Sequence, residues 1–202
     1  GQDLHLEGGD LTEAINAGVA KGYTEGYLRK SVVAEPLFNR VNTQNNTPAI
    51  IYTKIVPGDQ LRIELTCKGF GSENKGGIKM LVPADGGEGV KKAVLDIIQH
   101  ASCNPCPPMV VGVGIGGTMD QAAYLSKRAL MRNITVRNEH PDYANLENEL
   151  LEMINKTGIG PQLGGTTSAL AVNIEWGPTH IAGLPVAVTI CCHACRHAVR
   201  VL

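Results

Sequence analysis

The sequence is poor in aromatic residues and carries no excess of charge of either sign. Its 202 residues include one tryptophan, five tyrosines and two phenylalanines, and 18 lysines and arginines stand against 19 aspartates and glutamates. A nucleic-acid-binding protein needs a basic stripe, so we expect no nucleic-acid partner. No apolar run approaches the roughly 18 residues of a membrane-spanning helix, and no signal-peptide pattern is present, so we expect no membrane association.

Glycine and cysteine, by contrast, are plentiful and unevenly placed. The 24 glycines gather in a few loops, which is typical of ordered turns that approach a ligand or another chain, and not of disorder. The six cysteines cluster, and two of them are adjacent, in a chain longer than most disulfide scaffolds. We therefore expect reduced thiols and a cytoplasmic location.

The pattern of apolar runs and turn signals predicts an α/β protein, with mixed β-sheets flanked by helices in a single domain over residues 1–202. Asp10 and Glu13 have the spacing of a capping box that opens the first helix. Helices are expected over residues 10–30, 89–100, 118–132 and 142–156. Strands are expected over residues 49–56 and 60–67, joined as a hairpin, then over 109–114, 169–176 and from 184 onward.

Cys106 lies in an Asn-Pro-Cys-Pro-Pro motif just before an expected strand. Pro105 and Pro107 restrict the backbone and remove N–H donors, so the sulfur sits on a stiff turn. Such stiffness suits a metal or cluster ligand, although a buried structural cysteine is the more common use of this residue. With Cys103 it also forms a C-x-x-C pair, which leaves a zinc or redox half-site open.

A second group of thiols follows the last apolar run, in the Cys-Cys-His-Ala-Cys-Arg-His segment at residues 191–197. Successive side chains of a strand point to opposite faces, so Cys191 and Cys192 should not face one site together. Cys192, next to the end of the strand, is the better ligand candidate, and Cys191 is expected to pack in the core. Roles stay open for the other members of the thiol and imidazole set: Cys67, Cys103, Cys195, His193 and His197.

The segment Gly-Val-Gly-Ile-Gly-Gly at residues 112–117 matches the G-x-G-x-x-G pattern between an expected strand and an expected helix. No clear parallel strand with an acidic end follows that helix. Asp120 in its first turn would also repel a pyrophosphate. We expect a tight turn packed near Cys106 here, and not a dinucleotide site.

Two further loops contain candidate binding groups. The glycine-rich stretch at residues 68–77 begins with Lys68 and can cradle an anion through backbone N–H groups, with a mobile surface loop as the alternative. His180 lies in a loop between two expected buried strands. There it either reaches a substrate or is satisfied within the loop.

Together these segments resemble the alpha subunit of class I, iron–sulfur-dependent fumarate hydratase and L-tartrate dehydratase, which corresponds to the N-terminal domain of single-chain members. The resemblance runs through essentially the whole chain. It is carried by motifs at residues 7–11, 26–32, 68–74, 104–108, 112–118, 160–165, 178–185 and 192–197.

The resemblance implies a [4Fe–4S] cluster on three cysteines, with one iron left open as a Lewis acid toward the substrate hydroxyl and carboxylate. Two of the ligands match Cys106 and Cys192. The third belongs to a Cys-Gln-Asp-Thr-Gly motif that precedes the Glu-Gly-Gly-Asp segment, and Gly1 stands where that cysteine would be. We therefore expect a truncated N-terminus and a third ligand outside this chain.

The same resemblance implies the substrate site. His180 matches a histidine that contacts substrate, and Arg29 matches an arginine that binds a substrate carboxylate. The glycine loop is implied to line the site through Lys68, Gly69, Phe70, Gly71 and Asn74. The proton-abstracting base and further basic residues come from a C-terminal domain or beta subunit, so a beta-subunit partner is expected, in a homodimer or an α2β2 assembly.

The implied activity is that of a hydro-lyase on a four-carbon 2-hydroxy dicarboxylic acid. The reaction would convert (S)-malate to fumarate or L-tartrate to oxaloacetate reversibly, and the isolated chain would be inactive. The alternative is a non-catalytic assembly domain that is free of metal or binds zinc.

Overall fold

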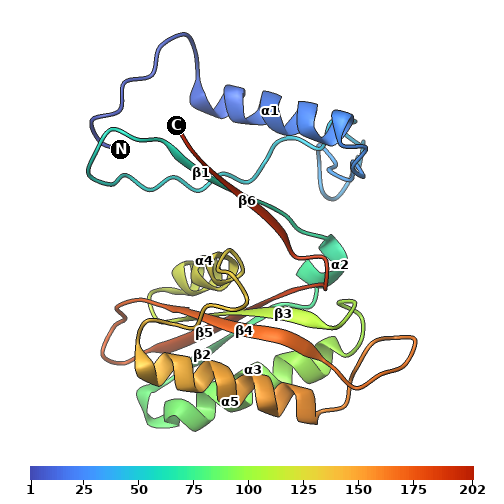
Figure 1. Ribbon diagram of the computed structural model, residues 1–202, viewed down its shortest axis with the longest axis vertical. Helices are drawn as coiled ribbons and strands as arrows, with labels where there is room; N and C mark the ends of the chain where they lie inside the picture. The colour runs from blue at the N-terminus through green and yellow to red at the C-terminus, as the bar shows by residue number, and fades with distance from the viewer. The chain divides into compact units, whose positions relative to one another are not determined.

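The computed structural model describes all residues 1–202, which divide into two compact units. One unit holds residues 1–63 and 201–202, and the other holds residues 64–200. The elements, in chain order, are α1 (Leu11–Glu25), β1 (Arg62–Cys67), α2 (Phe70–Glu73), β2 (Gly77–Leu81), the 3₁₀ helix η1 (Pro83–Asp85), α3 (Gly86–Ala101), β3 (Met109–Ile115), α4 (Met119–Ala129), α5 (Pro141–Lys156), β4 (Ala169–Trp176), β5 (Leu184–Cys191) and β6 (Arg196–Val201) (Figure 1).

The mixed α/β class with helix-flanked sheets is therefore confirmed, whereas the single domain over residues 1–202 stays a prediction. None of the helices combines the length and the apolarity that a membrane crossing requires.

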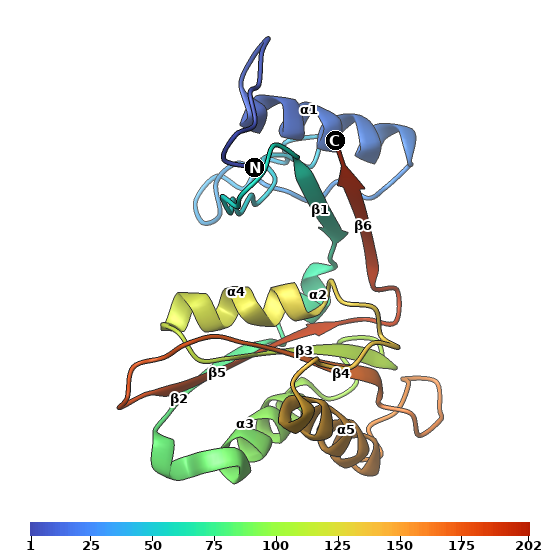
Figure 2. The same ribbon diagram turned by 60° about the vertical axis from the view of Figure 1, so that its left-hand side comes forward.

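The larger unit is built on a four-stranded sheet in the order β2-β5-β3-β4. β5 runs antiparallel to both of its neighbours, and β3 runs parallel to β4. α4 covers one face of the sheet, while α3 and α5 cover the other (Figure 2). The main core fills the space under α3 and α5, with Val94, Ile98, Leu150 and Ile154 from the helices fully buried against the strands.

The central strand β3 shows why its glycines are needed. All seven of its residues are buried. Val111 and Val113 face the main core, whereas Gly112 and Gly114 point the other way, toward α4. A Cβ atom on Gly114 would lie 2.1 Å from the carbonyl oxygen of Ala122, so only glycine lets α4 approach this closely.

The end of the same motif forms the expected tight turn, with Gly116 and Gly117 at φ 91° and 74°. The expectation that this turn lies near Cys106 was wrong. Cys106 precedes the start of β3 and the turn follows its end, and seven residues of strand span about 20 Å. The strand that lies parallel to β3 is β4, which was predicted as a strand but not as this partner, because two helices separate the two strands along the chain.

Other boundaries differ from the expectations for local reasons. α1 begins at the predicted cap, where the Asp10 carboxylate accepts the N–H of Glu13 at 2.8 Å, but it ends at Glu25 because Gly26 and the left-handed Tyr27 break it. α4 begins at Met119 and ends at Ala129, inside the expected range of 118–132, and the Thr118 hydroxyl before it donates to the Asp120 carboxylate and makes no cap hydrogen bond.

The predicted hairpin between residues 49–56 and 60–67 was wrong. Residues 49–56 form no strand, and β1 pairs with β6 from the end of the chain. At the end of this pairing Leu61 and Leu202 exchange two backbone hydrogen bonds, of 3.1 and 2.9 Å. β6 was missed because all six of its residues are exposed, and the predicted loop at residues 68–77 contains α2 and the start of β2.

The outer edge of β4 is closed by side chains. The amide of Asn138 donates to the carbonyl of Ile174, and the N–H of Ile174 donates to the Glu147 carboxylate at 2.8 Å. Asn155 of α5 accepts the N–H of Ala169 and donates to its carbonyl. These contacts satisfy backbone groups that a free sheet edge would leave open.

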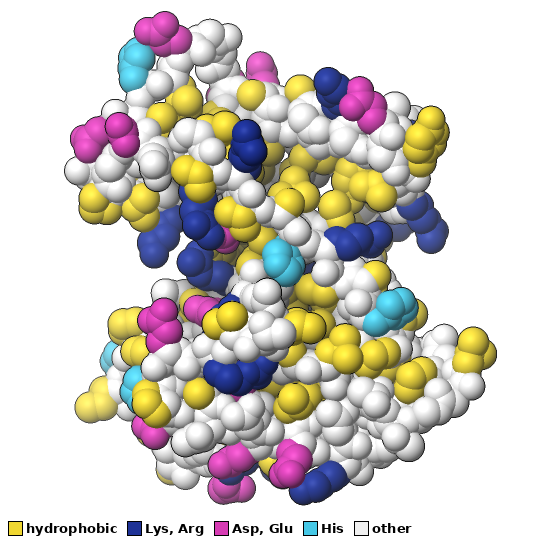
Figure 3. All heavy atoms as spheres, in the orientation of Figure 1, with side chains coloured by type: hydrophobic (Ala, Val, Ile, Leu, Met, Phe, Trp, Pro, Cys, Tyr) yellow, Lys and Arg dark blue, Asp and Glu magenta, His cyan; other side chains and the backbone are white.

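The smaller unit has no buried residue anywhere in residues 1–63 or 201–202. α1 buries none of its side chains, and Tyr27 and Phe38 are 95% and 90% exposed. Figure 3 shows apolar side chains at the surface around this part of the chain. Local hydrogen bonds shape it, for example three backbone N–H groups that donate to the Glu35 carboxylate.

Because burial of apolar surface dominates folding stability, this unit should open before the larger one. We expect trypsin to cut the isolated chain after Lys30, Arg40 or Lys54 first and to leave a resistant fragment that contains α3 to β5. Mass spectrometry of timed digests checks this order. A first cut inside α3, α4 or α5 would contradict it, since those helices hold the core residues of the larger unit.

Candidate functional site

The two candidate ligand cysteines lie at the same end of the sheet. Cys106 precedes β3 and Cys192 follows β5, and the antiparallel register places Val110 opposite Cys191. The carbonyl oxygen of Cys106 also accepts two hydrogen bonds from His193, one from its backbone N–H at 3.3 Å and one from its ring Nδ1 at 3.2 Å. The two thiol-bearing segments are thereby joined directly.

The turn at Cys106 is conformationally unusual. Its φ of 59° is left-handed, which costs an L-residue other than glycine on the order of 1–2 kcal/mol. The neighbouring Pro105 and Pro107 are buried and hold the turn, while Cys106 itself is exposed. Strain of this kind concentrates at functional sites.

The two hydrogen bonds from His193 to the carbonyl oxygen of Cys106, called the His193 clamp below, fix the tautomer of the His193 ring. A carbonyl oxygen only accepts hydrogen bonds, so Nδ1 of His193 must carry the proton in this contact. His193 is exposed, and its other ring nitrogen is not used by the clamp. His193 therefore holds the backbone of Cys106 and makes no hydrogen bond with its thiol.

The neighbouring thiols are engaged elsewhere. Cys191 is buried against Val110 and Leu130, which confirms its expected place in the core. A hydrogen bond with Cys191 lowers the pKa of Cys195 to about 7 and raises the pKa of Cys191. The sulfur of Cys195 lies 3.8 Å from the carbonyl oxygen of Leu130.

All six cysteines are free thiols. Within residues 1–202, no group of three or more His, Cys, Asp or Glu side chains is arranged to hold a metal ion. The site as built by this chain thus offers two thiols, from Cys106 and Cys192.

Lys68 lies near the same thiols, since it interacts electrostatically with Cys191 and Cys195. Its side chain is only 12% exposed. The ammonium donates to the hydroxyl of Ser72 at 3.0 Å and forms an ion pair of 3.1 Å with Glu73. Burial lowers the pKa of Lys68, and the ion pair with Glu73 offsets part of that effect.

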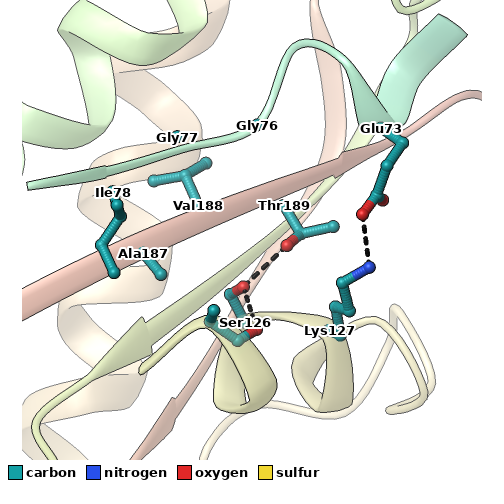
Figure 4. Close-up of a pocket in the computed structure, with 10 residues that line it drawn as sticks. Glu73, Gly76, Gly77, Ile78, Ser126, Lys127, Ala187, Val188 and Thr189 are labelled. Carbon is teal, nitrogen blue, oxygen red and sulfur yellow. Dashed lines mark hydrogen bonds and ion pairs between the residues drawn. The ribbon is translucent and has the colours of Figure 1, made fainter. Parts of the chain in front are cut away.

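Glu73 pairs with a second lysine, Lys127 of α4 (Figure 4). Burial raises the pKa of Glu73, but its two lysine partners outweigh burial and hold the pKa below its ordinary value. Beside this pair, Ser126 and Thr189 share a hydrogen bond of 2.7 Å, and all four residues line a cavity of about 220 Å³.

Sequence reasoning missed Glu73 and Lys127. The signal for Glu73 was an acidic residue inside the short glycine motif that begins at Lys68. Lys127 carries no such signal, because it lies on the predicted helix among other polar residues and its role depends on how α4 packs against β5.

The remaining residues of this loop form α2 and its two ends. Gly69 caps the helix, and Gly69, Gly71 and Asn74 are exposed together with Phe70. α2 packs against β5, so the exposed side of this loop is held at the same end of the sheet as Cys192. Its proposed contact with substrate stays a prediction.

His180 and Arg29 lie elsewhere. His180 is exposed beyond the end of β4, at the opposite end of the sheet from Cys106, and its Nδ1 accepts the N–H of Ala182 at 3.2 Å. Arg29 is exposed in the segment after α1 and belongs to the smaller unit. Within one chain the structure therefore brings together Cys106, Cys192 and Lys68, but not His180.

Comparison with known proteins shows the family of the chain. A family model described as fumarate hydratase (Fumerase) matches residues 1–201. The chain belongs to this family. Fumarate hydratases are hydro-lyases, which add water to a double bond or remove it.

Two relatives of this fumarate hydratase family member illustrate the match. A protein of Methanocaldococcus jannaschii, provisionally named L(+)-tartrate dehydratase subunit alpha, is 45% identical over 94% of this chain and 68% of its own length. The L(+)-tartrate dehydratase subunit alpha of Escherichia coli K12 is 37% identical over 93% of this chain and 63% of its own length. The chain thus spans about two thirds of the length of these relatives.

Proposed function

We propose that this chain is the alpha-subunit part of a hydro-lyase that reversibly dehydrates a four-carbon 2-hydroxy dicarboxylic acid. The observation that carries the proposal is that His193 joins the segments of Cys106 and Cys192 at one end of the sheet, near Lys68, in a member of the fumarate hydratase family. The names of the relatives favour L-tartrate as the first substrate to test and (S)-malate as the second.

The donor set fits a [4Fe–4S] cluster in part. Cys106 presents an exposed sulfur on a held turn, and Cys192 lies half-buried next to the clamp at His193. These two residues would hold the cluster, and the third thiolate is proposed to come from outside residues 1–202, as the family resemblance implies. When bound, a cluster with an open iron supplies a Lewis acid that eases departure of the hydroxyl group.

The chain's own residues would bind and orient the substrate. Lys68 offers a largely buried ammonium to a carboxylate, and a charged donor in a place of low dielectric binds more strongly than an exposed one. Backbone groups of Gly69 and Gly71 and the side chain of Asn74 are proposed to line the same side. Arg29 is proposed to bind a substrate carboxylate, as the family resemblance implies.

Further groups are proposed to come from a partner. A beta subunit would supply the base that takes the carbon-bound proton, in an α2β2 assembly in the cytoplasm. His180, at the far end of the sheet, keeps its proposed substrate contact only as a prediction. The seven residues of β3, about 20 Å of strand, separate its end of the sheet from the end at Cys106.

The test is anaerobic reconstitution of the chain with iron and sulfide, with and without a beta subunit. We expect iron and acid-labile sulfide in the assembled protein, dehydration of L-tartrate or (S)-malate by the pair, and no activity of this chain alone. An assembled protein that holds the cluster but dehydrates neither acid would contradict the proposed reaction. Zinc without acid-labile sulfide would favour the assembly-domain alternative.

A further inference from the structure

Glu73 is placed to do more than stabilise the fold. Its carboxylate contacts two ammonium groups, Lys68 at 3.1 Å and Lys127 of α4. The three side chains are 26%, 12% and 41% exposed respectively. One lysine would be enough to neutralise the Glu73 carboxylate. The three side chains together therefore keep one surplus positive charge in a partly buried place.

The hydrogen-bonding capacity of Lys68 shows where that charge can act. An ammonium group has three N–H donors. The Ser72 hydroxyl accepts one of them, and the Glu73 carboxylate holds the ammonium in an ion pair of 3.1 Å; both residues lie on α2. That leaves an N–H donor for an anion, on a side chain with little freedom to turn away.

This donor lies near the end of the sheet that carries Cys106 and Cys192. Lys68 follows Cys67 at the end of β1 and interacts electrostatically with Cys191 and Cys195. Cys191 immediately precedes Cys192 at the end of β5, and the two thiols interact with each other. A carboxylate bound near Cys192 would therefore lie within the field of this fixed charge.

We propose that Glu73 is a positioning residue, which anchors the Lys68 ammonium through α2 so that its remaining N–H meets a carboxylate of the substrate. Lys127 holds Glu73 from α4 and thereby ties the loop at residues 68–74 to the body of the sheet. This inference rests on the proposed function, and it assigns to Glu73 an indirect part in substrate binding.

The test is a double-substitution cycle in the assembled, reconstituted enzyme. Glu73→Gln and Lys68→Met are each expected to lower kcat/KM for the active substrate roughly 10- to 100-fold, mainly through KM, because each removes a charged hydrogen bond or its support. The same variants should weaken binding of succinate, a four-carbon dicarboxylate that cannot be dehydrated, by a similar factor in calorimetry. The double variant should bind no worse than Lys68→Met alone.

A matched control is Glu88→Gln. Its carboxylate also pairs with a lysine, Lys91 at 2.8 Å, but it is 86% exposed on α3. This variant should keep wild-type kinetics, since exposed ion pairs contribute little.

Three outcomes would overturn the inference. One is a Glu73→Gln enzyme with wild-type KM and succinate affinity, even if its melting temperature falls, because the residue would then be structural only. Another is a double variant whose losses multiply, because Glu73 would then act independently of Lys68. The third is unchanged succinate binding in Lys68→Met. This variant leaves Glu73 paired with Lys127, so its result would overturn the inference even where Glu73→Gln does not fold. A wild-type complex that dehydrates neither acid is a separate result, and it contradicts the proposed function itself.

Discussion

Replacing Cys106 by serine is expected to abolish both cluster retention and dehydration by the assembled enzyme. A serine hydroxyl does not ionise near neutral pH and cannot replace a thiolate as an iron ligand. The fold itself should change little. The thiol is exposed, and its one hydrogen-bond contact, to the carbonyl oxygen of Asn104, is long at 4.0 Å.

The measurement is iron and acid-labile sulfide per chain, together with activity and thermal unfolding of the cluster-free protein. We expect the unfolding free energy to stay within about 0.5 kcal/mol of wild type. Cys103→Ser is the matched control, since it removes the other thiol of the C-x-x-C pair. Cluster retention in Cys106→Ser would contradict the ligand assignment, and loss of metal in both variants would favour a C-x-x-C half-site.

Replacing Glu147 by glutamine should have the largest effect on stability. The Glu147 side chain is fully buried in α5, where it pairs with Arg132 and Arg137 and accepts the backbone N–H groups of Asn138 and Ile174. A glutamine amide has one acceptor oxygen and would turn an NH₂ group toward other donors. Breaking a buried pair on one side costs about 3–5 kcal/mol, so we expect a loss of that size.

Denaturant unfolding followed by tryptophan fluorescence measures this loss in the larger unit alone. Trp176 is the only tryptophan of the chain, and it stacks on Tyr143 of α5 with 5.3 Å between ring centroids. The matched control on the same helix is Glu152→Gln, whose carboxylate is 73% exposed and 3.3 Å from Lys156. It should change stability by less than about 0.5 kcal/mol. Equal effects of the two substitutions would show that the buried network adds nothing.

The parts of the fold that sequence predicted are those with a local signal. β4 and α5 match their expected ranges almost to the residue, because an apolar run and a capped periodic pattern mark them. The hairpin failed because β1 finds its partner about 130 residues later in β6, an exposed strand with no alternation. No local pattern encodes such a pairing.

The candidate site divides in the same way. Side-chain alternation along the last apolar run separated Cys191 from Cys192, and the structure confirms the buried place of Cys191. The clamp of His193 on Cys106 could not be predicted, since it depends on the antiparallel register of β3 and β5. Glu73 could not be predicted, because its role depends on an ion pair between α2 and Lys127 of α4 that only the folded chain forms.

The absence of buried side chains in residues 1–63 makes this part of the protein sensitive to mass action. A segment with little apolar burial of its own draws stability from any molecule that binds its folded form, by an amount that grows with the logarithm of that molecule's concentration. Its apparent folding stability is therefore not a constant of the chain. The concentration of any such binding molecule should therefore decide how much of residues 1–63 is folded.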